Sequence, residues 1–136
     1  MRLLLDTHVL IWLAEGLAEL DASARELVDD AAAAHGVAVS AISFWEVAML
    51  ARRGRLSLSQ PVGVWRERVV SAPGVVEAAI DGSVAIESVQ LPGDLHADPA
   101  DRLIVATARV HGWRLATRDR RLLDYGAAGH ASTIAV

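Results

Sequence analysis

Short apolar runs that alternate with helical segments constrain the fold of this chain more than any other feature. The runs lie at residues 3–5, 37–39, 75–79, 114–117 and 133–136. Most of these runs are followed by a segment that has helical spacing or begins with a residue that favours a helix start, such as Ser40 or Asp119. Parallel strands need helical crossovers of this kind. The pattern therefore predicts an α/β fold with a short parallel sheet of about five strands, flanked by helices on both faces.

Residues that start and stop helices mark the expected helix boundaries. Helices are predicted around residues 9–13, over about 21–34, from residue 40 or 43 to about 53, and over about 61–72, 81–91 and 98–111, with one further helical turn over 119–123. The segment RLIVATARVHG, which ends at Gly112, is apolar nearly all round. Such a helix is typically buried on most sides.

The length and composition predict one ordered domain over residues 1–136. The chain has 53% hydrophobic and 22% charged residues, which is typical of a protein with a real core. It has no cysteine, which excludes disulfides and thiolate metal sites and permits a reducing compartment. No apolar run approaches the roughly 18 residues that a membrane-spanning helix needs. We therefore expect a cytoplasmic protein without a membrane partner.

The formal net charge of −4 argues, on its face, against a nucleic-acid-binding protein. However, the chain has no lysine, so every basic residue is arginine, the better bidentate ligand for phosphate. The arginines also cluster, at 52, 53 and 55 and again at 118, 120 and 121. Net charge therefore leaves nucleic-acid binding open.

Four acidic residues are predicted to meet at one edge of the sheet. Asp6 and Asp119 follow strands, Asp101 begins the buried helix, and Glu46 lies in the helix after the second strand. Ligands of open α/β sheets bind at this edge. Four carboxylates there would repel one another unless a cation neutralised them. Oxygen ligands with open positions suit Mg²⁺ or Mn²⁺, which activate water and stabilise a reacting phosphodiester.

Each acid also has a purely structural explanation. Asp6 and Asp119 are favoured residues for a helix N-cap, and Asp98 before Pro99 fits a cap better than a ligand. Asp101 is a favourable charge in a first helical turn. Ser43 and Glu46 have the spacing of a capping box. These alternatives stay open at the level of sequence.

Three blocks of the chain, LLLDTHVLIW, VSAISFWEVAMLARRGRL and DLHADPADRLIVATARVHGWRLATRDRRLLDYG, resemble PIN-domain ribonucleases, and most closely the VapC toxins. The resemblance covers nearly the whole chain, with residues 56–91 contributing least. It implies a small parallel sheet between helices. It also implies a set of functional residues: the catalytic, metal-binding acids Asp6, Glu46, Asp101 and Asp119, an additional ligand or cap at Asp98, and orienting hydroxyls at Thr7 and Thr117.

The resemblance further implies a Mg²⁺- or Mn²⁺-dependent endoribonuclease that cuts structured RNA such as tRNA or rRNA. Such proteins are usually homodimers. They are inhibited by a VapB antitoxin whose C-terminal segment lies in an apolar groove and can plug the acidic site. The expected RNA contacts are Arg118, Arg120, Arg121 and Arg102. Arg52 and Arg53 have an alternative role as partners of their helix dipole.

The aromatic residues and His8 are expected to have mainly packing roles. Trp12, Trp45, Trp65 and Trp113 are predicted to lie in the core rather than to stack on bases, with Trp12 the best candidate for a partner groove. His8 is predicted to be a packed imidazole or to lie just behind the metal ligands.

Two other functions were weighed against the nuclease. A haloacid-dehalogenase-type phosphatase needs a second aspartate where His8 stands, and a lysine, which this chain lacks. A PIN-fold scaffold that binds RNA or a protein without cutting stays open, although the intact set of four acids argues against it.

Overall fold

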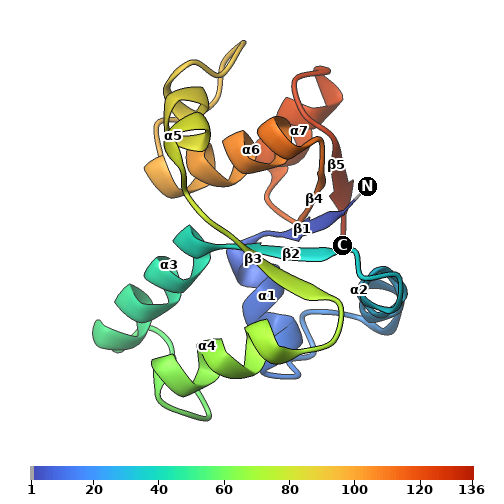
Figure 1. Ribbon diagram of the computed structural model, residues 1–136, viewed down its shortest axis with the longest axis vertical. Helices are drawn as coiled ribbons and strands as arrows, with labels where there is room; N and C mark the ends of the chain where they lie inside the picture. The colour runs from blue at the N-terminus through green and yellow to red at the C-terminus, as the bar shows by residue number, and fades with distance from the viewer. Residues whose placement is uncertain (1) are drawn as a thin grey trace.

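The computed structural model describes residues 2–136, which form a five-stranded sheet in the order β3-β2-β1-β4-β5 (Figure 1). The strands are β1 (Leu3–Leu5), β2 (Val37–Ser40), β3 (Val75–Ala78), β4 (Arg114–Thr117) and β5 (Thr133–Ala135). All neighbouring strands pair in parallel. The predicted short parallel sheet is confirmed. With β1 at its centre, residues that follow β1, β2 and β4 meet at one edge.

Helices cover both faces of this sheet, as predicted. They are α1 (Thr7–Ala14), α2 (Ala22–Ala33), α3 (Ala41–Arg52), α4 (Val62–Ser71), α5 (Gly82–Val89), α6 (Pro99–His111) and α7 (Arg120–Ala127). Helices α5, α6 and α7 lie on one side of the sheet, and α1, α3 and α4 on the other (Figure 1). Within residues 2–136, none of these helices combines the length and apolarity needed to cross a bilayer.

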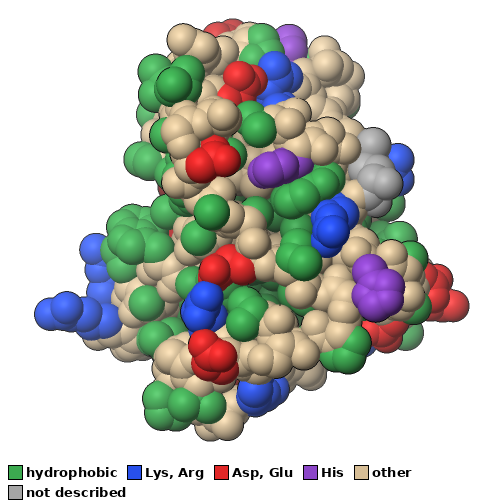
Figure 2. Space-filling view, in the orientation of Figure 1, with side chains coloured by type: hydrophobic (Ala, Val, Ile, Leu, Met, Phe, Trp, Pro, Cys, Tyr) green, Lys and Arg blue, Asp and Glu red, His purple; other side chains and the backbone are tan. Residues whose placement is uncertain are grey.

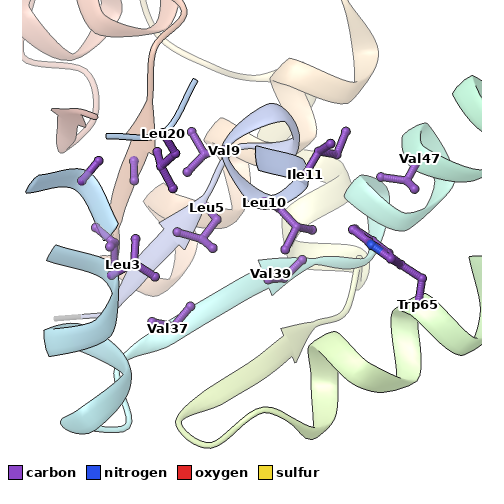
Figure 3. Packing of buried hydrophobic residues seen from close by; sticks show 13 residues of the cluster. Leu3, Leu5, Val9, Leu10, Ile11, Leu20, Val37, Val39, Val47 and Trp65 are labelled. Atoms are coloured by element: carbon purple, nitrogen blue, oxygen red, sulfur yellow. The ribbon is translucent and has the colours of Figure 1, made fainter. Parts of the chain in front are cut away.

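The core has two halves because successive residues of a strand point to opposite faces. Leu5 of β1 packs into the half that contains Leu10 of α1 and Trp65 of α4. Its neighbour Leu4 packs into the other half, with Ile104 of α6. Figure 3 shows the first half from close by, with Leu10 and Trp65 on the same side of the strands. The strand β1 therefore connects both halves of the core.

Helix α6 has the boundaries and the burial that its sequence predicts. The Asp98 side chain accepts a hydrogen bond from the Asp101 N–H (3.0 Å), Pro99 occupies the first turn, and Gly112 ends the helix with a φ of 68°. Five consecutive residues, 104–108, are buried. A helix covered on so many sides holds Asp101 firmly at the edge of the sheet.

Helix α7 is longer than the single turn predicted from sequence. It continues to Ala127 because Leu122 and Tyr125, three residues apart, are both buried in the core. The Tyr125 hydroxyl also donates a hydrogen bond to the Pro92 carbonyl (2.5 Å). Gly126 lets the helix approach β5 closely, since a Cβ at that position would lie 2.0 Å from Thr133 Oγ1. The prediction missed these contacts because they are made outside the segment.

Candidate active site

One pocket of about 360 Å³ brings together all the acidic residues predicted to be functional. It lies where β1 and β4 end and where α1, α6 and α7 begin. Its lining residues are Asp6, Thr7, His8, Val9, Trp12, Glu46, Asp98, Asp101, Arg118, Asp119 and Arg121. The structure thus places carboxylates from four separate segments around one space. We call it the acidic pocket.

Asp6 is the most buried acid of the pocket, with an exposed fraction of 8%. Its Oδ1 accepts a hydrogen bond from the Thr7 N–H (2.8 Å), and its Oδ2 accepts one from the Thr117 hydroxyl (2.7 Å). Burial raises the pKa of Asp6 above its ordinary value of 3.8, and these two hydrogen bonds only partly offset that effect. Asp6 is therefore an oriented carboxylate in an unfavourable place for a charge.

Glu46 reaches the pocket from α3 and is held by Thr7. The Thr7 hydroxyl donates a hydrogen bond to Glu46 Oε1 (2.5 Å). Thr7 has one hydroxyl proton, so the Ser43 hydroxyl, 2.9 Å away, must be the donor in the Thr7–Ser43 contact. Burial raises the pKa of Glu46, and the negative charges of Asp101 and Asp6 raise it further. The proposed capping box was wrong, because α3 begins earlier, with Ser40 as its N-cap.

Asp101 is paired with a residue that the sequence interpretation missed. His96 Nε2 lies 2.6 Å from Asp101 Oδ2, and both side chains are largely buried. The other ring nitrogen of His96, Nδ1, is buried and has no hydrogen-bond partner within residues 2–136. The only signal in the sequence was the position of His96 in the loop just before the DPADR segment. That spacing does not by itself predict a contact.

Asp119 sits at the start of α7 and is neutralised by Arg121. Its Oδ1 accepts a hydrogen bond from the Arg121 N–H (2.8 Å), and its Oδ2 lies 3.2 Å from Arg121 Nη2. Burial alone would raise the pKa of Asp119, but the hydrogen bonds and charge of Arg121 outweigh it and hold this pKa below 3.8. The same Nη2 is 4.0 Å from Asp101 Oδ2. Arg121 thus offsets part of the negative charge of the pocket.

Some of the aspartates that cap helices also line the acidic pocket. Five aspartates cap helices in this structure: Asp6, Asp21, Asp81, Asp98 and Asp119. Only Asp6, Asp98 and Asp119 of this set also line the acidic pocket. Capping therefore does not exclude a second role for these three. The shared pocket is the feature that separates them from Asp21 and Asp81.

The acidic pocket fits a divalent cation by the chemistry of its donors. Every acid there offers hard carboxylate oxygens, and Mg²⁺ typically takes one or two carboxylates and keeps several waters. Within the described part of the chain, however, no three acidic or histidine side chains are arranged as a group that could hold a metal ion. Instead, Asp101 is bonded to His96, and Asp119 to Arg121.

The structure bears on three other predicted residues. Arg102, a predicted RNA contact, donates hydrogen bonds to the carbonyls of Ser88 (2.9 Å) and Leu95 (3.0 Å) and braces the loop before α6. His8 is exposed and not packed, but it lines the acidic pocket together with Asp6, and its ring centroid lies 6.1 Å from that of Trp12. Trp45 is 54% exposed, although it was predicted to lie in the core.

Other aromatic and basic residues divide between core and surface. Trp65 is completely buried, as predicted, whereas Trp12 and Trp113 are half-buried. Basic side chains project at the C-terminal end of α3, where Arg52 is the last residue and Arg53 the C-cap (Figure 2). This position agrees with a role as partners of the helix dipole.

A second pocket, of about 350 Å³, lies on the other side of α1 and is mostly apolar. We call it the apolar pocket. Its apolar lining includes Leu10 and Leu13 of α1, Val28 of α2, and Trp65 and Val69 of α4. Trp12 lines the acidic pocket, not this one. The tryptophan of the apolar pocket is therefore Trp65, and Trp12, the predicted candidate for a partner groove, lies in the acidic pocket instead.

Comparison with known proteins identifies the family. The model of the PIN domain matches residues 3–128. Ribonuclease VapC22 of Mycobacterium tuberculosis is 43% identical over 122 residues, which is 90% of each chain. A crystal structure of VapBC2 from Rickettsia felis bound to promoter DNA has the same fold, with a TM-score of 0.73 and 13% identity over 99% of this chain and 98% of that one. DNA-bound VapBC from Salmonella typhimurium gives a TM-score of 0.68 and 18% identity, with the same coverage of both chains. The chain therefore belongs to the PIN-domain family.

Proposed function

We propose that the protein is a Mg²⁺- or Mn²⁺-dependent endoribonuclease, the toxin of a toxin–antitoxin pair. The observation that carries the proposal is the acidic pocket, in which a buried Asp6 and a half-buried Glu46 lie beside the charge of Asp101. A protein that keeps carboxylates where their pKa values are raised forgoes stability, which is characteristic of functional sites. The 43% identity to a protein named a ribonuclease supports the same activity.

We assign the metal ligands to Asp6, Glu46, Asp101 and Asp119, with Asp98 as an additional ligand at the edge. The Thr117 hydroxyl orients Asp6, and the Thr7 hydroxyl orients Glu46. A bound divalent ion would polarise the scissile phosphate and lower the pKa of a coordinated water. Glu46, which the Thr7 hydroxyl orients from α3, would hold the ion together with Asp6 and Asp101.

Arginines beside the acids are the proposed contacts for the RNA. Arg118, Arg120 and Arg121 flank Asp119 and are all exposed. Arg121 already lies between Asp119 and Asp101. When a cation binds these carboxylates, Arg121 would be released from them and could pair with the RNA phosphate instead. Structured RNA such as tRNA or rRNA is the substrate class that we propose from the resemblance to VapC toxins.

We assign the antitoxin to the apolar pocket. The solved relatives with this fold include VapBC assemblies, which pair a PIN-fold chain with a second protein. An apolar side chain of a VapB-type segment would replace water against Leu13 and Val69, while the rest of the segment crosses α1 toward the acids. A homodimer located in the cytoplasm completes the proposal.

Cleavage of total cellular RNA by the purified, antitoxin-free protein tests this proposal. We expect discrete fragments with Mg²⁺ that disappear with EDTA and with Asp6→Ala. Fragments that persist in EDTA would contradict a metal-dependent reaction. RNA that is bound but left intact by folded wild-type protein would favour the non-cutting scaffold instead.

A further inference from the structure

Three side chains that the proposed catalysis leaves unused form one wall of the acidic pocket. They are His8, Trp12 and Arg118. The guanidinium carbon of Arg118 lies 4.6 Å from the centroid of the Trp12 indole. The Arg118 Nε donates a hydrogen bond to the main-chain oxygen of Val136 (2.9 Å). The indole ring and the main-chain acceptor therefore both contact the guanidinium group.

The charge of Arg118 is not used by the acids around it. Arg121 pairs with Asp119 at 3.2 Å and approaches Asp101 at 4.0 Å. Within residues 2–136, Arg118 forms no ion pair with an acidic side chain, although five such side chains line the same pocket. A guanidinium has five N–H donors, and Arg118 uses one of them on Val136. The remaining donors and the outer face of the plane are open to a ligand.

A guanidinium group that lies against an indole ring is best suited to bind an unstacked nucleobase. Unstacked RNA bases stack on arginine planes and on aromatic rings, and hydrogen-bond through their edges. A phosphate is bound through the N–H edge of a guanidinium and makes no use of an aromatic ring behind its face. The exposed imidazole of His8, whose ring centroid is 6.1 Å from that of Trp12, extends the same wall. The wall thus offers more flat surface than phosphate binding requires.

We propose that Arg118, supported by Trp12 and bordered by His8, is a subsite that stacks on a nucleobase next to the scissile phosphate of the RNA. This inference rests on the proposed nuclease function, because the wall and the acids line one pocket. The subsite selects which nucleotide flanks the cut. It leaves the hydrolysis itself to the carboxylates.

Arg118→Lys tests the subsite because lysine keeps the charge and loses the plane. The matched control is Arg53→Lys, the same replacement at the exposed C-cap of α3. Binding is measured in EDTA with a short single-stranded RNA and with an abasic strand of equal length. Cleavage of a random-sequence RNA pool in Mg²⁺ is read by sequencing the ends.

We expect Arg118→Lys to weaken RNA binding about tenfold, to leave binding of the abasic strand unchanged, and to relax the nucleotide preference at the cut. Arg118→Gln should weaken binding of both strands and flatten the salt dependence. Trp12→Leu should resemble Arg118→Lys.

Two results would overturn the subsite. One is Arg118→Lys with the affinity and cleavage preference of the wild type. The other is an equal loss of affinity for RNA and for the abasic strand, which would reduce Arg118 to a phosphate contact. In both cases the wild type still cuts RNA, so the nuclease proposal stands. A wild type that cuts nothing would instead overturn the nuclease proposal.

Discussion

The acidic and apolar pockets have similar volumes, about 360 and 350 Å³, but opposite chemistry. Helix α1 separates them: Thr7 lines the acidic pocket, whereas Leu10 and Leu13 line the apolar one. The apolar pocket is bordered by fully buried side chains such as Trp65, which stabilise the fold. The acidic pocket holds Asp6 and Glu46 with raised pKa values, which weakens the fold.

The two sides of α1 therefore have different roles: one side contributes to stability, and the other to the proposed function. Apolar surface removed from water favours folding in proportion to its area, whereas a buried charge opposes folding until a partner arrives. The same helix therefore supports the core on one side and carries unfavourable charge on the other. Substitutions in the two pockets should have opposite effects.

The largest effect on stability is expected on the apolar side. Trp65→Ala should lower the free energy of unfolding by about 3–5 kcal/mol, because the indole is completely buried and leaves a cavity. Urea denaturation measures the loss. The matched control is Trp45→Ala, at a site that is 54% exposed, and it should change stability far less. Equal losses in the two variants would contradict the assignment of Trp65 to the core.

On the acidic side, Asp101→Asn should reduce RNA cleavage by more than about a hundredfold. Changing a residue that only hydrogen-bonds to a metal ligand already costs up to about a hundredfold, and Asp101 is itself a proposed ligand. The metal-free protein should stay folded because asparagine is nearly isosteric with aspartate. Initial rates at saturating Mg²⁺ measure the effect. Asp81→Asn, at an N-cap outside the pocket, should cut normally. A fully active Asp101→Asn would refute the ligand assignment.

Asp6→Asn should make the metal-free protein more stable at neutral pH, because it removes a charge that is disfavoured by burial, which also raises the pKa of Asp6. Asparagine keeps an acceptor for the Thr7 N–H and removes the buried charge. Urea denaturation in EDTA measures the gain. A loss of stability would mean that the cap and the Thr117 hydrogen bond outweigh the cost of burial.

The smallest effect is a dependence of this gain on pH. A carboxylate with a raised pKa in the folded state stabilises the fold fully only below its unfolded pKa. That contribution is lost as the pH rises from 3.8 for Asp6, or 4.5 for Glu46, through the raised folded pKa. Asp119, with its lowered pKa, acts in the opposite sense, because its stabilisation is lost as the pH falls below 3.8.

The stability difference between Asp6→Asn and the wild type should therefore grow from about pH 4 toward neutral pH. Denaturation at a series of pH values in EDTA measures it. A difference that stays constant with pH would show that Asp6 titrates normally.

The sequence was sufficient to predict the sheet edge, because parallel strands bring their ends together whatever the details of packing. That rule predicted that Asp6 and Asp119 lie at the same edge, and the structure adds a hydrogen bond from the Thr117 hydroxyl to Asp6, across 111 residues of sequence. It also placed Asp101 in the same pocket through a helix whose cap and stop residues were unambiguous.

Contacts made by loops and by helix surfaces were not predictable from the sequence. His96 meets Asp101 only through the path of the loop before α6, which no local pattern encodes. Glu46 has the sequence of a capping box, but its partner is Thr7 from another helix. Trp45 lies in an apolar segment and still faces solvent, because α3 buries the faces that carry Ser43 and Val47. Tertiary packing decided each of these cases.

The most direct test of a metal site in the acidic pocket is a Mn²⁺ titration followed by electron paramagnetic resonance. The wild type should bind Mn²⁺, and Asp101→Asn should bind it at least about tenfold more weakly. Asp21→Asn and Asp81→Asn remove equivalent capping charges outside the pocket and should bind like the wild type. If Asp101→Asn binds Mn²⁺ as tightly as the wild type, the acidic pocket is not the metal site.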